Sequence, residues 1–254
     1  MAHLQELHTP HYDIRLLPMS RPFVWLSNAW LDIKHHQTSS LAYGVLISAL
    51  GALMLTYQQH PYFIAAYMGL FLALGPMLAA GLCELSRCSD LNQTTDFDTS
   101  LKVLRKNTRA LVSVAALMFS ICLVWFVASH AIIATMIGNA VPSVHLTLWD
   151  NLSGNISSQQ FIAYGISTMI LGIIVFSLSI VTIPMIIDRH IDAKSAILTS
   201  LETFTKDSSA LLVWGFIITS LVGVAFLSKL LLMPLIFPLL GHATWYAYKD
   251  LIKD

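Results

Sequence analysis

The sequence predicts an all-α, polytopic membrane protein, and three observations lead to this fold class. Hydrophobic residues make up 56% of the 254-residue chain and charged residues only 11%, whereas about 25% of a soluble domain is charged. Uncharged runs of about 18 residues or more recur along the chain, as expected of transmembrane helices. Lys and Arg residues are confined almost entirely to every second connecting segment, which is the pattern of a protein that crosses a membrane repeatedly.

The N-terminal part of the chain predicts a surface helix ahead of the first crossing. Residues 1–21 are polar, so we expect an irregular cytoplasmic segment followed by a single membrane domain over residues 22–254. Pro22 suits the first turn of a helix, and the apolar residues after it recur at helical spacing. These residues are Phe23, Leu26, Trp30 and Ile33. Polar residues such as Asp32 fall on the other faces, which predicts a helix over 22–36 lying on the membrane surface.

Six apolar runs in the rest of the chain predict six transmembrane helices arranged as three hairpins. Their approximate ranges are 40–57, 62–82, 110–137, 161–187, 210–227 and 230–246. The third and fourth runs are longer than the roughly 20 residues that cross a bilayer core, so these helices must tilt or protrude. The last run contains Pro234 and Pro238, each of which removes a backbone donor, and a re-entrant segment is the alternative to a full crossing.

The positions of the charges predict the orientation. Every Lys and Arg residue except Lys229 falls in the N-terminal segment, in the segments after the second and fourth runs, or in the C-terminal segment. The positive-inside rule then puts both termini in the cytoplasm, and we expect a multi-pass protein of the bacterial inner membrane. The formal net charge of zero gives no bulk attraction to nucleic acid, so we expect no nucleic-acid partner.

An internal repeat is predicted by the polar segments that precede the third and fifth runs, which align with an offset of 100 residues. Thr99, Ser100, Leu101, Lys106, Ala110 and Leu111 match Thr199, Ser200, Leu201, Lys206, Ala210 and Leu211. The segment before the first run fits more weakly at an offset of 70. The predicted unit is a cytoplasmic interfacial helix followed by a hairpin of two spans, used three times around a possible pseudo-threefold axis. Chance similarity in a chain of biased composition is the alternative.

The predicted interfacial helices are amphipathic. Leu101, Leu104 and Leu111 share one face of the second of them, and basic residues cover the opposite face. A cation near an anionic membrane surface gains about 1 kcal/mol, so we expect the bilayer and its anionic lipid headgroups as partners. The residues expected to face the headgroups are Lys102, Arg105, Lys106, Arg109, Lys194 and Lys206. Docking of a cytoplasmic protein is the alternative use of this surface.

The even-numbered runs bring a proline close to a polar residue at their cytoplasmic ends. Asp188 and His242 each come four residues after a proline, and Glu84 comes one turn later in its run. If the repeats pack around a common axis, these three side chains approach one another, and Arg87 and Arg189 would pair with the acids. Such a cluster could relay protons, gate a pathway or bind a polar ligand. The alternative is a structural network that fixes the helix ends.

No enzyme motif stands out in the sequence. A Walker loop, a dinucleotide fingerprint, G-x-S-x-G and H-E-x-x-H are all missing from it, so we expect neither catalytic residues nor a cofactor. Cys83 and Cys88 have the wrong spacing for a zinc site, and we expect no metal. A copper site on the outer side is the weaker alternative, because His and Met can ligate copper. Its ligands would come from His60, His130, His145, Met54 and Met136.

Several short motifs carry a family resemblance. They are Trp25-Leu26…Ala29-Trp30…Asp32-Ile33, Ser40…Tyr43-Gly44, Gly75-Pro76…Ala79…Gly81-Leu82-Cys83-Glu84…Ser86-Arg87, Pro184…Asp188-Arg189 and Gly241-His242-Ala243-Thr244-Trp245…Tyr248-Lys249. Together they resemble a bacterial family of integral membrane proteins, domain of unknown function 2189. The chain departs from the family pattern at Cys83, where an aromatic is usual, and at Cys88, where a second basic residue is usual. The resemblance extends from about residue 22 to 251 and implies a six-span inner-membrane protein without an established activity.

The sequence leaves the function open between classes. We expect a non-catalytic accessory or scaffold component of a membrane complex, with protein partners or further copies of itself in the membrane, mainly because catalytic motifs are missing. The alternative is a transporter of a small molecule, an ion or a lipid, with Glu84, Asp188 and His242 along its path. An enzyme acting at the membrane is a third alternative.

Overall fold

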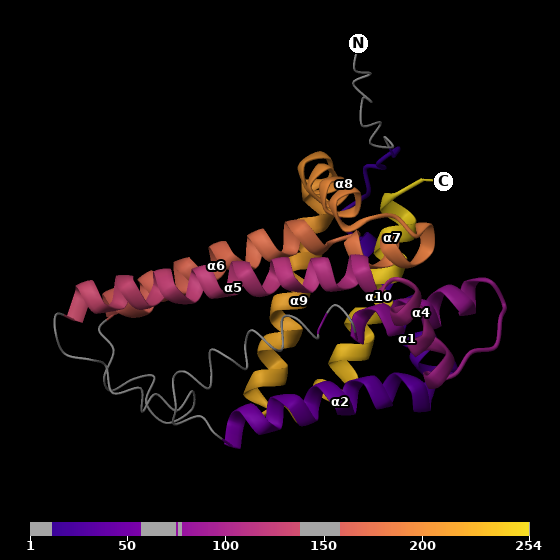
Figure 1. Cartoon of the computed structure of the whole chain (residues 1–254), viewed down its shortest axis with the longest axis horizontal. Helices are drawn as coiled ribbons and strands as arrows, with labels where there is room; N and C mark the ends of the chain where they lie inside the picture. The colour runs from indigo at the N-terminus through magenta and orange to yellow at the C-terminus, as the bar shows by residue number, and fades with distance from the viewer. Residues whose placement is uncertain (1–11, 57–74, 76–77, 138–157, 254) are drawn as a thin grey trace, which may run out of the picture.

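The described part of the protein is helical. The computed structural model describes residues 12–56, 75, 78–137 and 158–253. Its labelled helices are α1 (Arg21–His35), α2 (Gln37–Thr56), α4 (Phe97–Lys106), α5 (Thr108–Ile137), α6 (Ser158–Ser179), α7 (Thr182–Arg189), α8 (Ala193–Lys206), α9 (Ser208–Leu227) and α10 (Met233–Leu251). A further helix over 78–90 carries no label in Figure 1. It extends beyond the predicted end of the second run, so Glu84 and Arg87 lie inside a helix.

Three short helices are each joined to a longer one by a single residue. The joints are His36 between α1 and α2, Asn107 between α4 and α5, and Asp207 between α8 and α9. At each joint the backbone N–H still donates to the carbonyl four residues earlier, at 2.8 to 3.1 Å. The backbone amide of each joint residue therefore stays paired, although the helix is interrupted there.

Two stretches of the described residues are long and apolar enough to cross a membrane. They are Thr108–Ala128 in α5 and Met169–Arg189 across α6 and α7, with mean hydropathies of 2.5 and 2.7. A third crossing arises if α8 and α9, which are bent by 108°, count as one span, and Gln37–Leu53 is a shorter apolar helix. The described residues thus contain two, or with the bent pair three, helices that could cross a membrane. The count of six spans stays a prediction, since most of the second predicted run lies outside the described residues.

The helices lie in different directions. In Figure 1, α5 and α6 run side by side, whereas α9 and α10 run at a steep angle to them. Helix α10 is central, because α1, α2, α7 and α9 all contact it. It continues through Pro238 without a break, so the chain does not turn back at this proline. At Gly44 a side chain would collide with the backbone carbonyl of Pro234, which shows that α2 and α10 meet backbone to backbone.

Helix α1 matches the bounds of the predicted surface helix within one residue. One side of it packs inside the protein, and two residues of the predicted apolar face point outward. The residues packed inside are Trp25, Ala29, Asp32 and Ile33, with the Trp25 ring edge-on to that of Trp214 at 5.7 Å. Phe23 is 61% exposed and Trp30 is 41% exposed. The Trp25–Ala29–Ile33 stripe packs on α10 and its neighbours with Leu26 partly buried beside it, and this leaves Phe23 and Trp30 facing outward.

Two segments from opposite ends of the chain pair through their backbones. Ile14 and Ile252 form an antiparallel bridge, in which the Arg15 amide donates to the Leu251 carbonyl at 2.9 Å and the Lys253 amide donates to the Asp13 carbonyl at 3.0 Å. The amide of Leu17 also donates to a carboxylate oxygen of Asp207 at 3.0 Å. We refer to the pairing of residues 13–15 with 251–253 as the terminal clasp.

Candidate functional site

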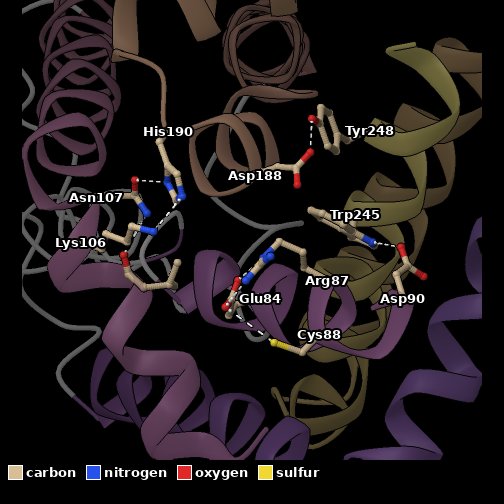
Figure 2. A network of polar contacts seen from close by, with 11 residues as sticks. Glu84, Arg87, Cys88, Asp90, Lys106, Asn107, Asp188, His190, Trp245 and Tyr248 are labelled. Carbon is tan, nitrogen blue, oxygen red and sulfur yellow. Dashed lines mark hydrogen bonds and ion pairs between the residues drawn. The ribbon is translucent and has the colours of Figure 1, made fainter. Parts of the chain in front are cut away.

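A basic cavity opens between α4, the helix over 78–90 and the end of α7. Its volume is about 200 Å³. The lining residues are Glu84, Arg87, Thr99, Lys102, Val103, Lys106, Ile187 and His190. The four from α4 follow one another at spacings of three, one and three, so they share one face of this helix. Figure 2 shows Glu84 and Arg87 on one side of this region and Lys106 and His190 on another.

Glu84 and Arg87 form a bidentate ion pair at the cavity wall. The Arg87 Nε atom donates to Glu84 Oε2 at 2.7 Å, and its Nη2 atom donates to Oε1 at 2.8 Å. Glu84 is only 8% exposed, and the thiol of Cys88 also approaches its carboxylate at 3.7 Å. The hydrogen bond from Arg87 to Glu84 raises the pKa of the guanidinium, with the charges of Glu84 and Asp188 acting in the same direction. A pair in this geometry holds the plane of the guanidinium fixed.

His190 holds Lys106 at the opposite wall. The ring Nδ1 atom lies 3.2 Å from Oδ1 of Asn107, and Nε2 lies 3.0 Å from the ammonium of Lys106. Since an ammonium can only donate, Nε2 must be the acceptor and Nδ1 the donor, which is a neutral ring. The backbone supports this contact, because His190 ends α7 in the left-handed conformation with φ 53°.

Asp188 and Arg189 share one partner, Tyr248 of α10. The Tyr248 hydroxyl donates to Asp188 Oδ2 at 2.6 Å and accepts from Arg189 Nε at 2.9 Å. Burial raises the pKa of the Tyr248 hydroxyl, as does the hydrogen bond to Asp188. Arg189 also donates to the Lys253 carbonyl at 3.3 Å, and its guanidinium lies 4.8 Å from the centre of the Tyr12 ring. This cluster therefore fastens the end of α7 to α10 and to the terminal clasp.

His242 belongs to a separate buried chain of polar groups. Its Nε2 atom lies 2.9 Å from the Ser40 hydroxyl and its Nδ1 atom lies 2.8 Å from the Ser86 hydroxyl. Ser86 donates to Asp32 Oδ2 at 2.6 Å, and Tyr246 donates to the same oxygen at 2.9 Å. Burial raises the pKa of the Asp32 carboxyl, although the hydrogen bonds from Ser86 and Tyr246 oppose this shift. The chain links α1, α2, the helix over 78–90 and α10.

The structure therefore brings the predicted cluster together only in part. Arg87 pairs with Glu84, and the charge of Asp188 also raises the pKa of Arg87. Figure 2 shows these three side chains in one region. His242 is bonded instead to Ser40 and Ser86. Sequence reasoning missed the residues that hold the predicted side chains, either directly or through one further polar group. They are Asp32, Ser40, Ser86, His190, Tyr246 and Tyr248.

The residues predicted to face lipid headgroups lie on the protein surface. All six are exposed, and Lys102 and Lys106 also line the cavity. Lys206 forms an ion pair with Glu202 at 2.8 Å. Contact with headgroups stays a prediction for all six.

The thiols and the possible metal ligands are dispersed. Cys83, Cys88 and Cys122 are buried free thiols. Within the described residues, no group of three His, Cys, Asp or Glu side chains could hold a metal ion. Of the copper ligands considered, His60 and His145 lie outside the described residues, as do the side chains of the other three.

Comparison with known proteins finds a match between part of the chain and one protein family. Residues 63–188 match the model of the family described as predicted integral membrane protein (DUF2189). Over these residues the chain is similar to that family. No curated protein and no solved structure matches the chain.

The match to DUF2189 includes Glu84, Arg87 and Asp188. The motif around Gly241 and those between Trp25 and Gly44 lie outside the matched residues, so the resemblance there rests on the motifs alone. The DUF2189 region also contains most of the cavity lining, with the sole exception of His190.

Proposed function

We propose that this protein is a non-catalytic accessory or scaffold component of a membrane complex, with other proteins or further copies of itself as partners in the bilayer. The observation that carries the proposal is that candidate polar residues hydrogen-bond to other helices of the same chain. Asp188, Arg189 and His242 bind side chains of other helices, and these contacts tie the helices together. Polar groups that satisfy one another within a membrane protein are expected to hold its architecture.

The proposed architecture is a six-span protein of the bacterial inner membrane with both termini in the cytoplasm. The terminal clasp supports an even number of crossings, because hydrogen-bonded segments lie on the same side of a membrane. The three one-residue joints support a unit of an interfacial helix followed by a hairpin, used three times. The joints at Asn107 and Asp207 differ by the 100 residues of the sequence offset.

The orientation can be tested with a membrane-impermeant maleimide on intact cells. Asp13→Cys and Lys253→Cys are expected to react only after permeabilisation, whereas Asn151→Cys in the predicted outer loop reacts at once. The wild-type chain is the control for labelling of its three cysteines. Labelling of position 13 or 253 in intact cells would contradict the proposed orientation.

The scaffold role can be tested by photo-crosslinking from outward-facing apolar positions. Phe216 in α9 is 74% exposed and Val124 in α5 is 69% exposed. A partner bound to one flank gives a protein adduct of constant mass from one of these positions and none from the other. A chain surrounded only by lipid gives lipid adducts at both positions and no protein adduct, which would contradict the scaffold role.

Transport of a small molecule, an ion or a lipid is the second candidate, and the cavity beside Glu84 and Arg87 is the observation that favours it. Flux is then expected to fall in Glu84→Gln and in Asp188→Asn while the fold is retained, because both changes remove a charge without removing volume. Unchanged flux in both variants would exclude these two residues from the path. Melting curves of the purified variants are the control for folding.

A further inference from the structure

We propose that the basic cavity binds a phosphate group. This site goes beyond the scaffold function and does not depend on it, since a scaffold and a transporter could each carry it. The ligand class is a phosphate oxyanion, which can come from the headgroup of an anionic lipid or from phosphate free in solution.

The charge of the lining favours an anion. Arg87, Lys102 and Lys106 contribute three positive charges, and Glu84 contributes one negative charge. The net charge of the lining is thus positive even with His190 neutral. Lys102 makes no hydrogen bond or ion pair within the described part of the chain, so its ammonium is available to a ligand.

The ion pair of Glu84 with Arg87 prepares the guanidinium for binding. An arginine side chain has five N–H donors, and the pair with Glu84 uses one on Nε and one on Nη2. Three N–H groups remain for an oxyanion. Because the pair already fixes the plane of the guanidinium, less conformational entropy is lost when a ligand binds.

On the opposite wall of the cavity, a hydrogen bond likewise fixes the position of the Lys106 ammonium. His190 holds the Lys106 ammonium at 3.0 Å through a single lone pair, which leaves the other ammonium hydrogens for a ligand. The buried side chains of Val103 and Ile187 form an apolar wall. The cavity of about 200 Å³ is several times the roughly 30 Å³ share of one water, so a tetrahedral oxyanion fits.

The test compares two variants of α4 that lose the same charge. Lys102→Gln changes a lining residue, and Arg105→Gln changes an exposed residue of α4 outside the lining. Binding of inorganic phosphate to the full chain in neutral detergent is measured by calorimetry. Binding of phosphatidic acid is measured by native mass spectrometry after release from nanodiscs, with phosphatidylcholine as the reference lipid.

Loss of one charge-assisted contact is expected to weaken phosphate binding about tenfold or more in Lys102→Gln. Arg105→Gln is expected to bind as tightly as the wild-type chain. Binding of inorganic phosphate that is weakened only in Lys102→Gln identifies free phosphate as the source. Retention of phosphatidic acid without binding of inorganic phosphate identifies the lipid headgroup. Equal losses in the two variants, or no preference for either phosphate probe over phosphatidylcholine and chloride, would overturn the proposal.

Discussion

Asp32 is a charged residue whose burial could not be predicted from its place in the sequence. It stands in an amphipathic helix and is nevertheless almost wholly buried, where Ser86 and Tyr246 both donate to one of its oxygens. A buried carboxylate costs free energy unless it is hydrogen-bonded or protonated. Its environment therefore links the stability of four helices to the protonation of one side chain.

The substitution Asp32→Asn should reduce the pH dependence of stability. Burial raises the pKa of Asp32 in the folded protein, so the folded state favours the protonated carboxyl. The wild-type chain then loses stability as pH rises from the unfolded pKa to the folded pKa, and the loss is constant above that range. Asparagine keeps an oxygen that accepts from Ser86 and Tyr246 and does not ionise.

The measurement is the melting temperature in detergent from about pH 4 to pH 8, taken as the variant minus the wild type. The difference is expected to rise in the acid range and then to level off. Taking the difference removes the opposite contribution of Asp250, whose pKa is lowered by hydrogen bonds from Arg21 and Trp25 despite the effect of burial. A difference that does not change with pH would contradict this account of Asp32.

The positions of the helices could be predicted from the sequence, whereas the contacts between helices could not. The helix over 22–36, the long apolar runs and the short helices before them follow from periodicity and hydropathy, which are local properties. Which face of a helix is buried is not local. Ser40 and His242 are 202 residues apart, and Ser86 and His242 are 156 apart. The polar chain exists only because α10 places these groups together.

At the scale of elements, the contact of α2 with α10 depends on Gly44. A methyl group at this position would meet the carbonyl of Pro234, and a backbone cannot move aside as a side chain can. Gly44→Ala is therefore expected to lower the free energy of unfolding by about 1–3 kcal/mol. The measurement is unfolding in detergent followed by circular dichroism.

The matched control for this change is Gly223→Ala in α9, where an added methyl group meets nothing within 4 Å. Alanine has the higher helix propensity, by about 1 kcal/mol, so this variant should be as stable as the wild type or more stable. Equal behaviour of the two variants would show that the backbone contact between α2 and α10 contributes little.

At the scale of the whole molecule, the terminal clasp fixes the relation between the first and last described segments. Ile14 and Ile252 face each other as a pair whose hydrogen bonds come from the neighbouring residues. In such non-hydrogen-bonded antiparallel pairs the Cα atoms are about 4.5 Å apart, which suits a disulfide. No feature of the sequence predicted this pairing, because residues 1–21 were expected to be irregular.

The double variant Ile14→Cys with Ile252→Cys is therefore expected to form an intramolecular disulfide under mild oxidation. Mass spectrometry of the unreduced protein detects the bond as a loss of two hydrogens. The control is Leu16→Cys with Ile252→Cys, since Leu16 is exposed and does not pair with Ile252. Equal yields of disulfide from the two double variants would show that the clasp is not populated.

The terminal clasp also has a consequence for biosynthesis. Residue 14 leaves the ribosome early, but its backbone partner emerges only after nearly all of the intervening chain has been made. Until then, the amide of Arg15 and the carbonyl of Asp13 have no partner in the clasp. The clasp therefore closes only after residues 251–253 have been made, whereas the helices between its two halves form from local contacts that exist earlier.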